Sequence, residues 1–329
     1  MNCRSLGGAN VAAGEAVRHK PGRPIANRPQ AASLPYNQHM RLIVILIAAA
    51  LAWAQNGTLL EVTTKGGRQF YSLPDEKGIV AAAQKNLDGD PGNVELALKL
   101  AAAQSGVWQY REAVATCTRV LKIASDNSAA LLERGHRELG LREFAQARDD
   151  LKRAMTLDPK KVDVYYHLGL AHYFLGEFEK SAEAFRHAVD LAPNTDSRIN
   201  SSNWLYASLR RAGKSRAAAE ALAAITPEMK NTADHTLFYL NLVRFFQGRL
   251  PEADAVPPEP PAGNTDTEAE LRFDTVGYGV GNWYLYNGKP EKAQDYFRRV
   301  AKGHVWVTWG FIGAETDLLH THSATNEHK

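Results

Sequence analysis

The chain has 329 residues, of which 44% are apolar, and a formal net charge of +3. Residues 1–54 hold six Lys or Arg and one acid, so the remainder has 33 basic and 35 acidic residues. A near-neutral body without a clustered basic stripe excludes a nucleic-acid-binding surface. The cysteines are Cys3 and Cys117, and Cys3 falls in a segment that we expect to be removed, which excludes a disulfide framework.

Residues 1–39 are rich in Gly, Pro, Asn and Arg and show no apolar period. We interpret them as disordered, or as an upstream segment that a mis-assigned start places before Met40. In either case they contribute nothing to the expected fold.

Residues 40–54 have the parts of a secretory signal peptide. Arg41 gives a basic start, the apolar run Leu42–Trp53 follows, and Ala54 ends an Ala-x-Ala site. The apolar run is shorter than the roughly 20 residues that span a bilayer, with an uncleaved anchor or a buried helix as the alternative. We expect cleavage after Ala54, a periplasmic or secreted protein, and no stable membrane span in the mature chain.

Residues 55–75 form an N-terminal extension ahead of the helical part. The segments Leu59–Thr63 and Arg68–Leu73 flank Lys65-Gly66-Gly67, a pattern that is typical of a β-hairpin. We therefore expect a short hairpin here.

The central part of the chain repeats at a spacing of 34 residues. Aromatic, small and apolar classes recur at fixed offsets, in the columns Tyr110, Phe144, Phe178; Ala113, Ala147, Ser181; Cys117, Leu151, Phe185; Val120, Ala154, Ala188; and Ile123, Leu157, Leu191. Within Asp163–Asn194, Gly176 separates two stretches whose apolar residues fall at three- and four-residue steps. Each stretch predicts an amphipathic helix that must bury its stripe on a neighbour.

This pattern resembles the tetratricopeptide repeat, a helix-turn-helix unit of 34 residues. The resemblance covers residues 76–250 and, after an interruption, residues 268–302. It implies an all-α, right-handed solenoid of about six helix-turn-helix pairs. Trp108 and Arg142 depart from the family pattern, because they occupy the position where the turn between the two helices usually has glycine.

Three further segments complete the expected organisation. Residues 251–267 contain five prolines and predict a loop that interrupts the repeats. Residues 303–320 carry Trp306 and Trp309 and predict a C-terminal cap that covers the last repeat, with a partner-binding patch as the alternative. We expect residues 321–329 to form a disordered tail.

No set of residues suggests catalysis or metal binding. His136, His167 and His172 lie on neighbouring predicted helices, but neither a cysteine pair nor a carboxylate cluster completes a coordination shell. Cys117 sits in a core column, where burial is more typical than reactivity. We therefore expect no enzyme, no metal and no cofactor.

The resemblance places a partner-binding groove on the first helices of the repeats. The corresponding positions are Leu132, His136, Tyr166, Leu170, Tyr173, Asn203, Arg210, Phe238, Tyr278 and Asn282. The lysine, asparagine and arginine clamp of some family members is missing, since its positions hold Leu98, Ala102, Leu132 and Tyr166. The aromatic and aliphatic centre suits an apolar or helical ligand, although the same aromatic residues could instead fill the core.

The expected function is a non-catalytic scaffold that binds a protein or peptide partner in this groove. The alternative is a non-catalytic subunit of an envelope complex that recognises glycan or cell-wall material through Trp204, Trp283, Tyr284 and Tyr286.

Overall fold

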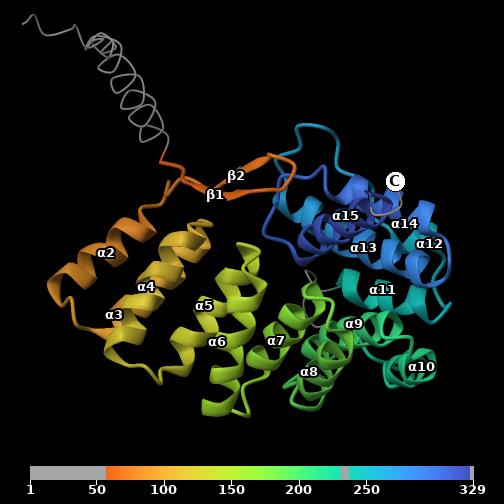
Figure 1. The fold of residues 1–329 in the computed structure, drawn as a ribbon, viewed down its shortest axis with the longest axis horizontal. Helices are drawn as coiled ribbons and strands as arrows, with labels where there is room; N and C mark the ends of the chain where they lie inside the picture. Colours follow the sequence, from red (N-terminus) through yellow and green to blue (C-terminus); the bar gives the residue numbers. More distant parts are fainter. Residues whose placement is uncertain (1–56, 231–236, 327–329) are drawn as a thin grey trace, which may run out of the picture. The chain divides into compact units, whose positions relative to one another are not determined.

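The computed structural model describes residues 57–230 and 237–326, and these are mostly helical with one two-stranded sheet (Figure 1). The expected helical-repeat class and the hairpin are both confirmed. The proposed upstream segment, residues 1–39, and the signal peptide, residues 40–54, lie outside the described residues.

Within the described residues the helices form six consecutive pairs. They are α3 (Val94–Gly106) with α4 (Tyr110–Ile123), α5 (Ser128–Gly140) with α6 (Phe144–Leu157), α7 (Val162–Phe174) with α8 (Phe178–Asp190), α9 (Thr195–Arg211) with α10 (Ser215–Ala223), α11 (Leu237–Phe246) with α12 (Glu252–Ala255), and α13 (Thr267–Tyr286) with α14 (Pro290–Val300). Helix α2 (Ile79–Gly89) precedes the pairs and α15 (Trp309–Asn326) follows them. From α2 to α9 each helix packs on the next one in the chain, as a repeat array requires.

Small residues let the two helices of a pair approach each other. A Cβ atom added to Gly169 of α7 would lie 2.7 Å from the ring of Phe185 of α8. The Ser181 hydroxyl donates a hydrogen bond of 2.8 Å to the Gly169 carbonyl, which ties the same two helices together. Asparagine residues cap the N-termini of several first helices. The side chains of Asn93, Asn127 and Asn194 accept hydrogen bonds from backbone N–H groups of the first turn.

The hairpin consists of β1 (Leu60–Thr63) and β2 (Gln69–Tyr71), which pair antiparallel. Val62 and Phe70 are buried and join the main hydrophobic core, so the hairpin is packed against the helices. The N–H of Leu73 bonds to the Val107 carbonyl in the turn between α3 and α4. Figure 1 shows the two strands between this turn and the C-terminal helices.

The end of the chain is more helical than the sequence suggested. The one-turn helix α12 lies inside the proline-rich segment, and α15 begins at Trp309 and continues to Asn326, into the expected tail. Helix α15 continues through Gly310. It packs so closely on α13 that a Cβ atom at Gly310 would lie 2.2 Å from the backbone oxygen of Asp274, so this position requires glycine. In the described residues no helix is both long and apolar enough to cross a membrane.

Candidate functional site

The ten predicted groove residues lie on α5, α7, α9, α11 and α13, and we call the face that carries them the inner face. This face is largely covered. Four of its residues are partly exposed, namely Leu132, His136, Tyr166 and Arg210. The other six are buried, namely Leu170, Tyr173, Asn203, Phe238, Tyr278 and Asn282.

Hydrogen bonds join several of these residues into one network. The Tyr173 hydroxyl donates to Asn282 Oδ1 over 3.1 Å, and Arg211 Nη1 donates to the same oxygen over 2.9 Å. The Tyr278 hydroxyl donates to Asp317 Oδ2 of α15 over 3.0 Å. Residues of α7, α9, α13 and α15 are thereby linked directly.

Arg210 and Phe238 are among the predicted positions that lie away from this network. Arg210 donates to the Tyr286 carbonyl and to Asn287 Oδ1, and its guanidinium lies 4.4 Å from the Tyr286 ring centroid. Phe238 packs beside Tyr239, with ring centroids 4.5 Å apart. Arg210 therefore belongs to a second cluster, with Tyr286 and Asn287.

Trp309, the first residue of α15, lies against the part of the inner face formed by α5 and α7. The Trp309 ring lies 5.4 Å from the ring of His136, 5.9 Å from His167 and 6.5 Å from Phe174, centroid to centroid. His136 and His167 themselves are 4.0 Å apart. The sequence predicted His136 as a groove residue. It did not predict that His167 and Trp309 lie beside His136 in the folded chain.

The electrostatic setting of the two histidines favours their neutral forms. Burial, the neighbouring His167 and the Arg137 guanidinium hold the pKa of His136 well below 6.5. Burial lowers the pKa of His167 to about 4, although its hydrogen bond to the Asp163 carbonyl opposes the shift. Glu133 is a carboxylate of α5 that raises the pKa of His167, and it is already paired with Arg137. Protonation of either ring would therefore place a poorly compensated cation beneath Trp309.

Two ion pairs hold α15 to the helix turns. Arg142 Nε lies 2.9 Å from Glu315 Oε2, and Arg211 Nη2 lies 2.8 Å from Asp317 Oδ1. All four side chains are at most 16% exposed. Buried pairs of this kind are costly to break, because the remaining partner is left as an uncompensated charge.

Trp306, just before α15, is the largest fully buried side chain among the described residues. Its ring lies 5.2 Å from Tyr110, 6.1 Å from Trp108 and 6.3 Å from Phe70, and its Nε1 donates to the Tyr71 carbonyl over 3.0 Å. The slot is made by the hairpin and the turn between α3 and α4. Trp306 thus fixes the C-terminal segment to the first repeat.

The hairpin turn also holds the end of α14. The Arg68 guanidinium donates to the carbonyls of Ala301, Lys302 and Gly303, which follow α14. The same guanidinium lies 4.6 Å from the Phe70 ring centroid. Terminal carbonyls of a helix lack partners of their own, so the arginine satisfies them.

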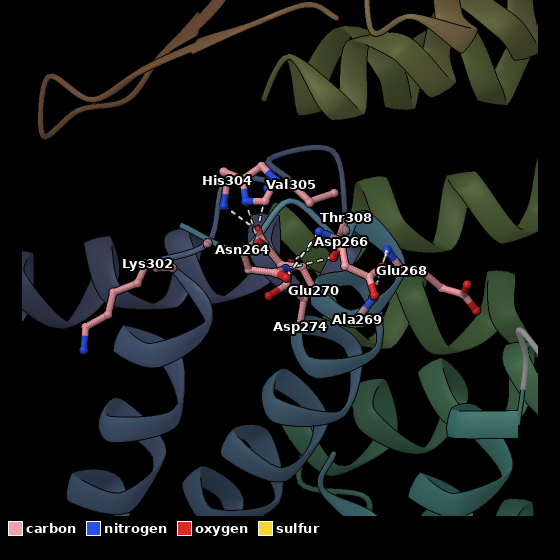
Figure 2. A network of polar contacts seen from close by, with 12 residues as sticks. Asn264, Asp266, Glu268, Ala269, Glu270, Asp274, Lys302, His304, Val305 and Thr308 are labelled. Atoms are coloured by element: carbon pink, nitrogen blue, oxygen red, sulfur yellow. Dashed lines mark hydrogen bonds and ion pairs between the residues drawn. The ribbon is translucent and has the colours of Figure 1, made fainter. Parts of the chain in front are cut away.

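A carboxylate of α13 fixes the loop that leads into α15 (Figure 2). Glu270 Oε1 accepts from the N–H groups of His304 and Val305, and Oε2 lies 2.6 Å from His304 Nδ1. One turn later Asp274 Oδ2 accepts from the Thr308 hydroxyl over 2.8 Å. Burial raises the pKa of Asp274 to about 8, so this carboxyl is mostly neutral at pH 7.

Two turns between paired helices have a residue other than glycine at the position with positive φ. Gly176, Gly213, Gly248 and Gly288 take positive φ values between the helices of their pairs. Trp108 and Arg142 take φ values of 58° and 67° at the same place, and they are the non-glycine residues with positive φ in the described part of the chain. Such a backbone costs about 1–2 kcal/mol for a side-chain-bearing residue. Both side chains contact Trp306, so the strained backbone holds them where they pack against the C-terminal segment.

A buried thiol and a cavity with ionisable lining residues bear on the question of catalysis. Burial raises the pKa of Cys117 to about 12, so its thiol is unreactive at neutral pH. In residues 57–230 and 237–326 no group of three or more His, Cys, Asp or Glu is placed to hold a metal ion. A cavity of about 490 Å³ beside Glu270 and Asp274 is bordered by the proline-rich segment. Among its lining groups Glu259 pairs with Arg299 and Glu270 with His304, whereas the buried Asp274 Oδ1 makes no hydrogen bond within the described chain.

Comparison with known proteins supports the repeat assignment. Residues 132–195 match the family model described as tetratricopeptide repeat. The small glutamine-rich tetratricopeptide repeat-containing protein 2 of Saccharomyces cerevisiae is 29% identical over 82 residues, which are 25% of this chain and 24% of that protein. The matched segment therefore spans about a quarter of the length of this curated relative.

Among solved structures, MamA is 25% identical, and the match covers 45% of this chain and 79% of MamA with a TM-score of 0.41. YrrB, described as a tetratricopeptide repeat protein with an unusual peptide-binding site, is 16% identical. That match covers 74% of this chain and 99% of YrrB with a TM-score of 0.41.

Proposed function

We propose that this protein is an exported, non-catalytic scaffold that binds a protein or peptide partner on the inner face of α5, α7 and α9. The observation that carries the proposal is that this face already accommodates a polypeptide segment, since α15 contacts it through Trp309, Glu315 and Asp317. A surface with an aromatic contact and two arginines suits recognition of a peptide helix.

Export is supported by the sequence of residues 40–54, which has the parts of a signal peptide. The absence of catalytic function is supported by the family match and by the buried thiol of Cys117. The partner itself is defined only as a polypeptide.

A glycan-binding role finds no support in the arrangement of the aromatic residues. Sugar recognition needs aromatic rings that are open to solvent, whereas Trp204 is 4% exposed and Tyr284 is 6% exposed. Trp283 lies against Phe245 and Tyr286 against Tyr206. The four residues do not form an open platform.

Site-specific photo-crosslinking tests the proposed function. A benzoylphenylalanine in place of His136 reports on the inner face, and one in place of the exposed Glu183 of α8 reports on the outer surface. We expect polypeptide adducts in the native host from position 136 and few from position 183. Adducts from position 183 alone would place the partner elsewhere and refute the proposal.

A further inference from the structure

We infer that the cavity beside Glu270 and Asp274 is a binding site for a primary alkylammonium group, which a small amine and a lysine side chain have in common. The ammonium head contacts the carboxyl group of Asp274, and the alkyl chain lies along the apolar part of the cavity wall. None of the ten predicted groove residues lines this cavity. The inference is therefore independent of the proposed function.

Three parts of the chain form the cavity, whose volume is about 490 Å³. They are the first turns of α13, the end of α14 with the residues after it, and the proline-rich segment. Phe273, Pro260 and Pro261 give the wall an apolar part. Pockets for small ligands have volumes of about 300–1,000 Å³, so this space accommodates an alkyl chain of several carbons.

The carboxyl group of Asp274 offers an unpartnered acceptor at this cavity. Asp274 is one of the lining residues and is 1% exposed. Its Oδ2 accepts from the Thr308 hydroxyl over 2.8 Å, whereas its Oδ1 makes no hydrogen bond within the described chain. Buried polar atoms of folded proteins nearly always have a partner, so an orphaned carboxyl oxygen in a cavity wall points to a ligand that donates a hydrogen bond. Because folding has already removed this oxygen from water, a ligand has little water to displace from it.

The charge around Asp274 favours a cationic donor. Burial and the negative charge of Glu270, one turn earlier on α13, raise the pKa of Asp274 to about 8, and the hydrogen bond from Thr308 opposes the rise. Glu270 is itself 4% exposed and accepts from the N–H groups of His304 and Val305. A cation at Asp274 relieves the repulsion between the two carboxyl groups, whereas an anionic ligand would add to it.

The cations of the cavity wall are engaged elsewhere. Arg299 Nε lies 2.6 Å from Glu259 Oε2, and its guanidinium lies 4.9 Å from the Tyr296 ring centroid. Lys302 is exposed, and Figure 2 shows its side chain directed away from Asp274. The ionised form of Asp274 therefore gains a counter-charge when an ammonium group binds.

Glu270 differs from Asp274 because charged groups of other elements face it. His304 Nδ1 lies 2.6 Å from Glu270 Oε2. Burial lowers the pKa of Arg68 in the hairpin, and the charge of Glu270 opposes this shift, so the two groups are close. Asp274 is therefore the acceptor that a ligand meets first. An ammonium group has three donors and no acceptor, which suits carboxyl oxygens.

The test uses the full chain with n-pentylamine, and with pentan-1-ol as a neutral molecule of similar shape. Ligand-observed NMR titrations measure the affinities. At pH 8.5 we expect pentylamine to bind at least tenfold more tightly than pentanol. Its binding should weaken about tenfold at pH 6.5, because Asp274 is protonated below about pH 8 while the amine stays charged.

Two variants locate the binding site. Asp274→Asn removes the charge and keeps an acceptor for Thr308, so it should bind pentylamine at least tenfold more weakly at pH 8.5 and without the pH dependence. Glu268→Gln is the matched control, since Glu268 is an exposed acid of α13 that does not line the cavity. It should keep the wild-type affinity. If Asp274→Asn folds poorly, a carbon-13 NMR titration of the Asp274 carboxyl in the wild type replaces it, and pentylamine should lower the midpoint of that titration.

A short peptide, acetyl-Gly-Gly-Lys-Gly-Gly-amide, distinguishes the two sources of the ammonium group. Binding of the peptide at least as tight as that of pentylamine would assign the site to a lysine of a polypeptide, and binding of pentylamine alone would assign it to a small amine. Failure of both to bind at pH 8.5 would overturn the inference. Equal binding of pentylamine and pentanol would overturn it as well, as would a wild-type Asp274 midpoint that pentylamine leaves unchanged.

Discussion

Arg142 and Glu315 are 173 positions apart in the chain and form a largely buried ion pair of 2.9 Å. Arg142 also donates to the carbonyls of Gly140 and Trp306. The turn between α5 and α6 is thereby tied to the C-terminal segment by one side chain, and this side chain stands where the repeat pattern expects glycine.

Arg142→Met should destabilise the protein by about 3–5 kcal/mol, because it leaves Glu315 buried without a counter-charge. The double variant with Glu315→Gln should recover part of this loss, with a coupling energy of about 0.5–3 kcal/mol. Urea unfolding of the four proteins measures the cycle. Additive effects would show that the two groups do not interact in solution.

Gly169→Ala should lower the stability by about 1–3 kcal/mol, because the new methyl group would overlap the Phe185 ring. Gly89→Ala is the matched control, since a Cβ atom there meets nothing within 4 Å and φ is not positive. We expect the control to be neutral or slightly stabilising. Thermal melts compare the two, and equal melting temperatures would contradict the observed packing of α7 on α8.

Stability should depend on pH through His136 and His167. Their pKa values are lowered in the folded chain, so the stabilisation is complete above about pH 6.5 and is lost as the pH falls toward about 4. For His167 the loss is about 1–3 kcal/mol after allowance for partial exposure.

Melting temperatures from pH 7.5 to 4.5 measure this effect. The double variant His136→Gln and His167→Gln should show a shallower decline than the wild type. A variant of the exposed His187 should follow the wild-type curve. Parallel curves for all three proteins would rule out the histidine pair as the titrating group.

Asp274→Asn should change the stability of the protein mainly at alkaline pH. The folded-state pKa of about 8 lies above the ordinary value of 3.8, so Asp274 contributes stability at low pH that is lost as the pH rises through 8. The amide stays neutral and can still accept from Thr308. We expect the variant to melt higher than the wild type at pH 9 and near it at pH 5. A variant that melts lower at pH 9 would show that the wild-type carboxylate is paired.

The sequence predicted the repeats because each unit packs on its neighbours, so that local columns such as Tyr110, Phe144 and Phe178 contain the necessary information. It could not predict that α15 covers α5 and α7, because no period relates Trp309 to His136. Tyr173 is 3% exposed because it packs against Phe178 and Trp204 and donates to Asn282 of α13, contacts that lie outside its own repeat unit or on the facing helix. Arg142 at a position where the repeat pattern has glycine is the signal that the sequence offers for the contact with α15.

Trp306→Ala and Trp309→Ala test whether the two tryptophans of the C-terminal segment contribute equally to its packing. Trp306 is 1% exposed and is enclosed by Phe70, Trp108 and Tyr110, so its truncation should cost about 3–5 kcal/mol. Trp309 is partly exposed, so we expect a loss below about 2 kcal/mol. Urea unfolding gives both values, and hydrogen exchange shows where each variant opens. Trp309→Ala should increase exchange in α5 and α7 without affecting the hairpin, whereas Trp306→Ala should increase exchange in the hairpin as well. Equal losses with identical exchange patterns would show that the whole C-terminal segment is a single structural cap.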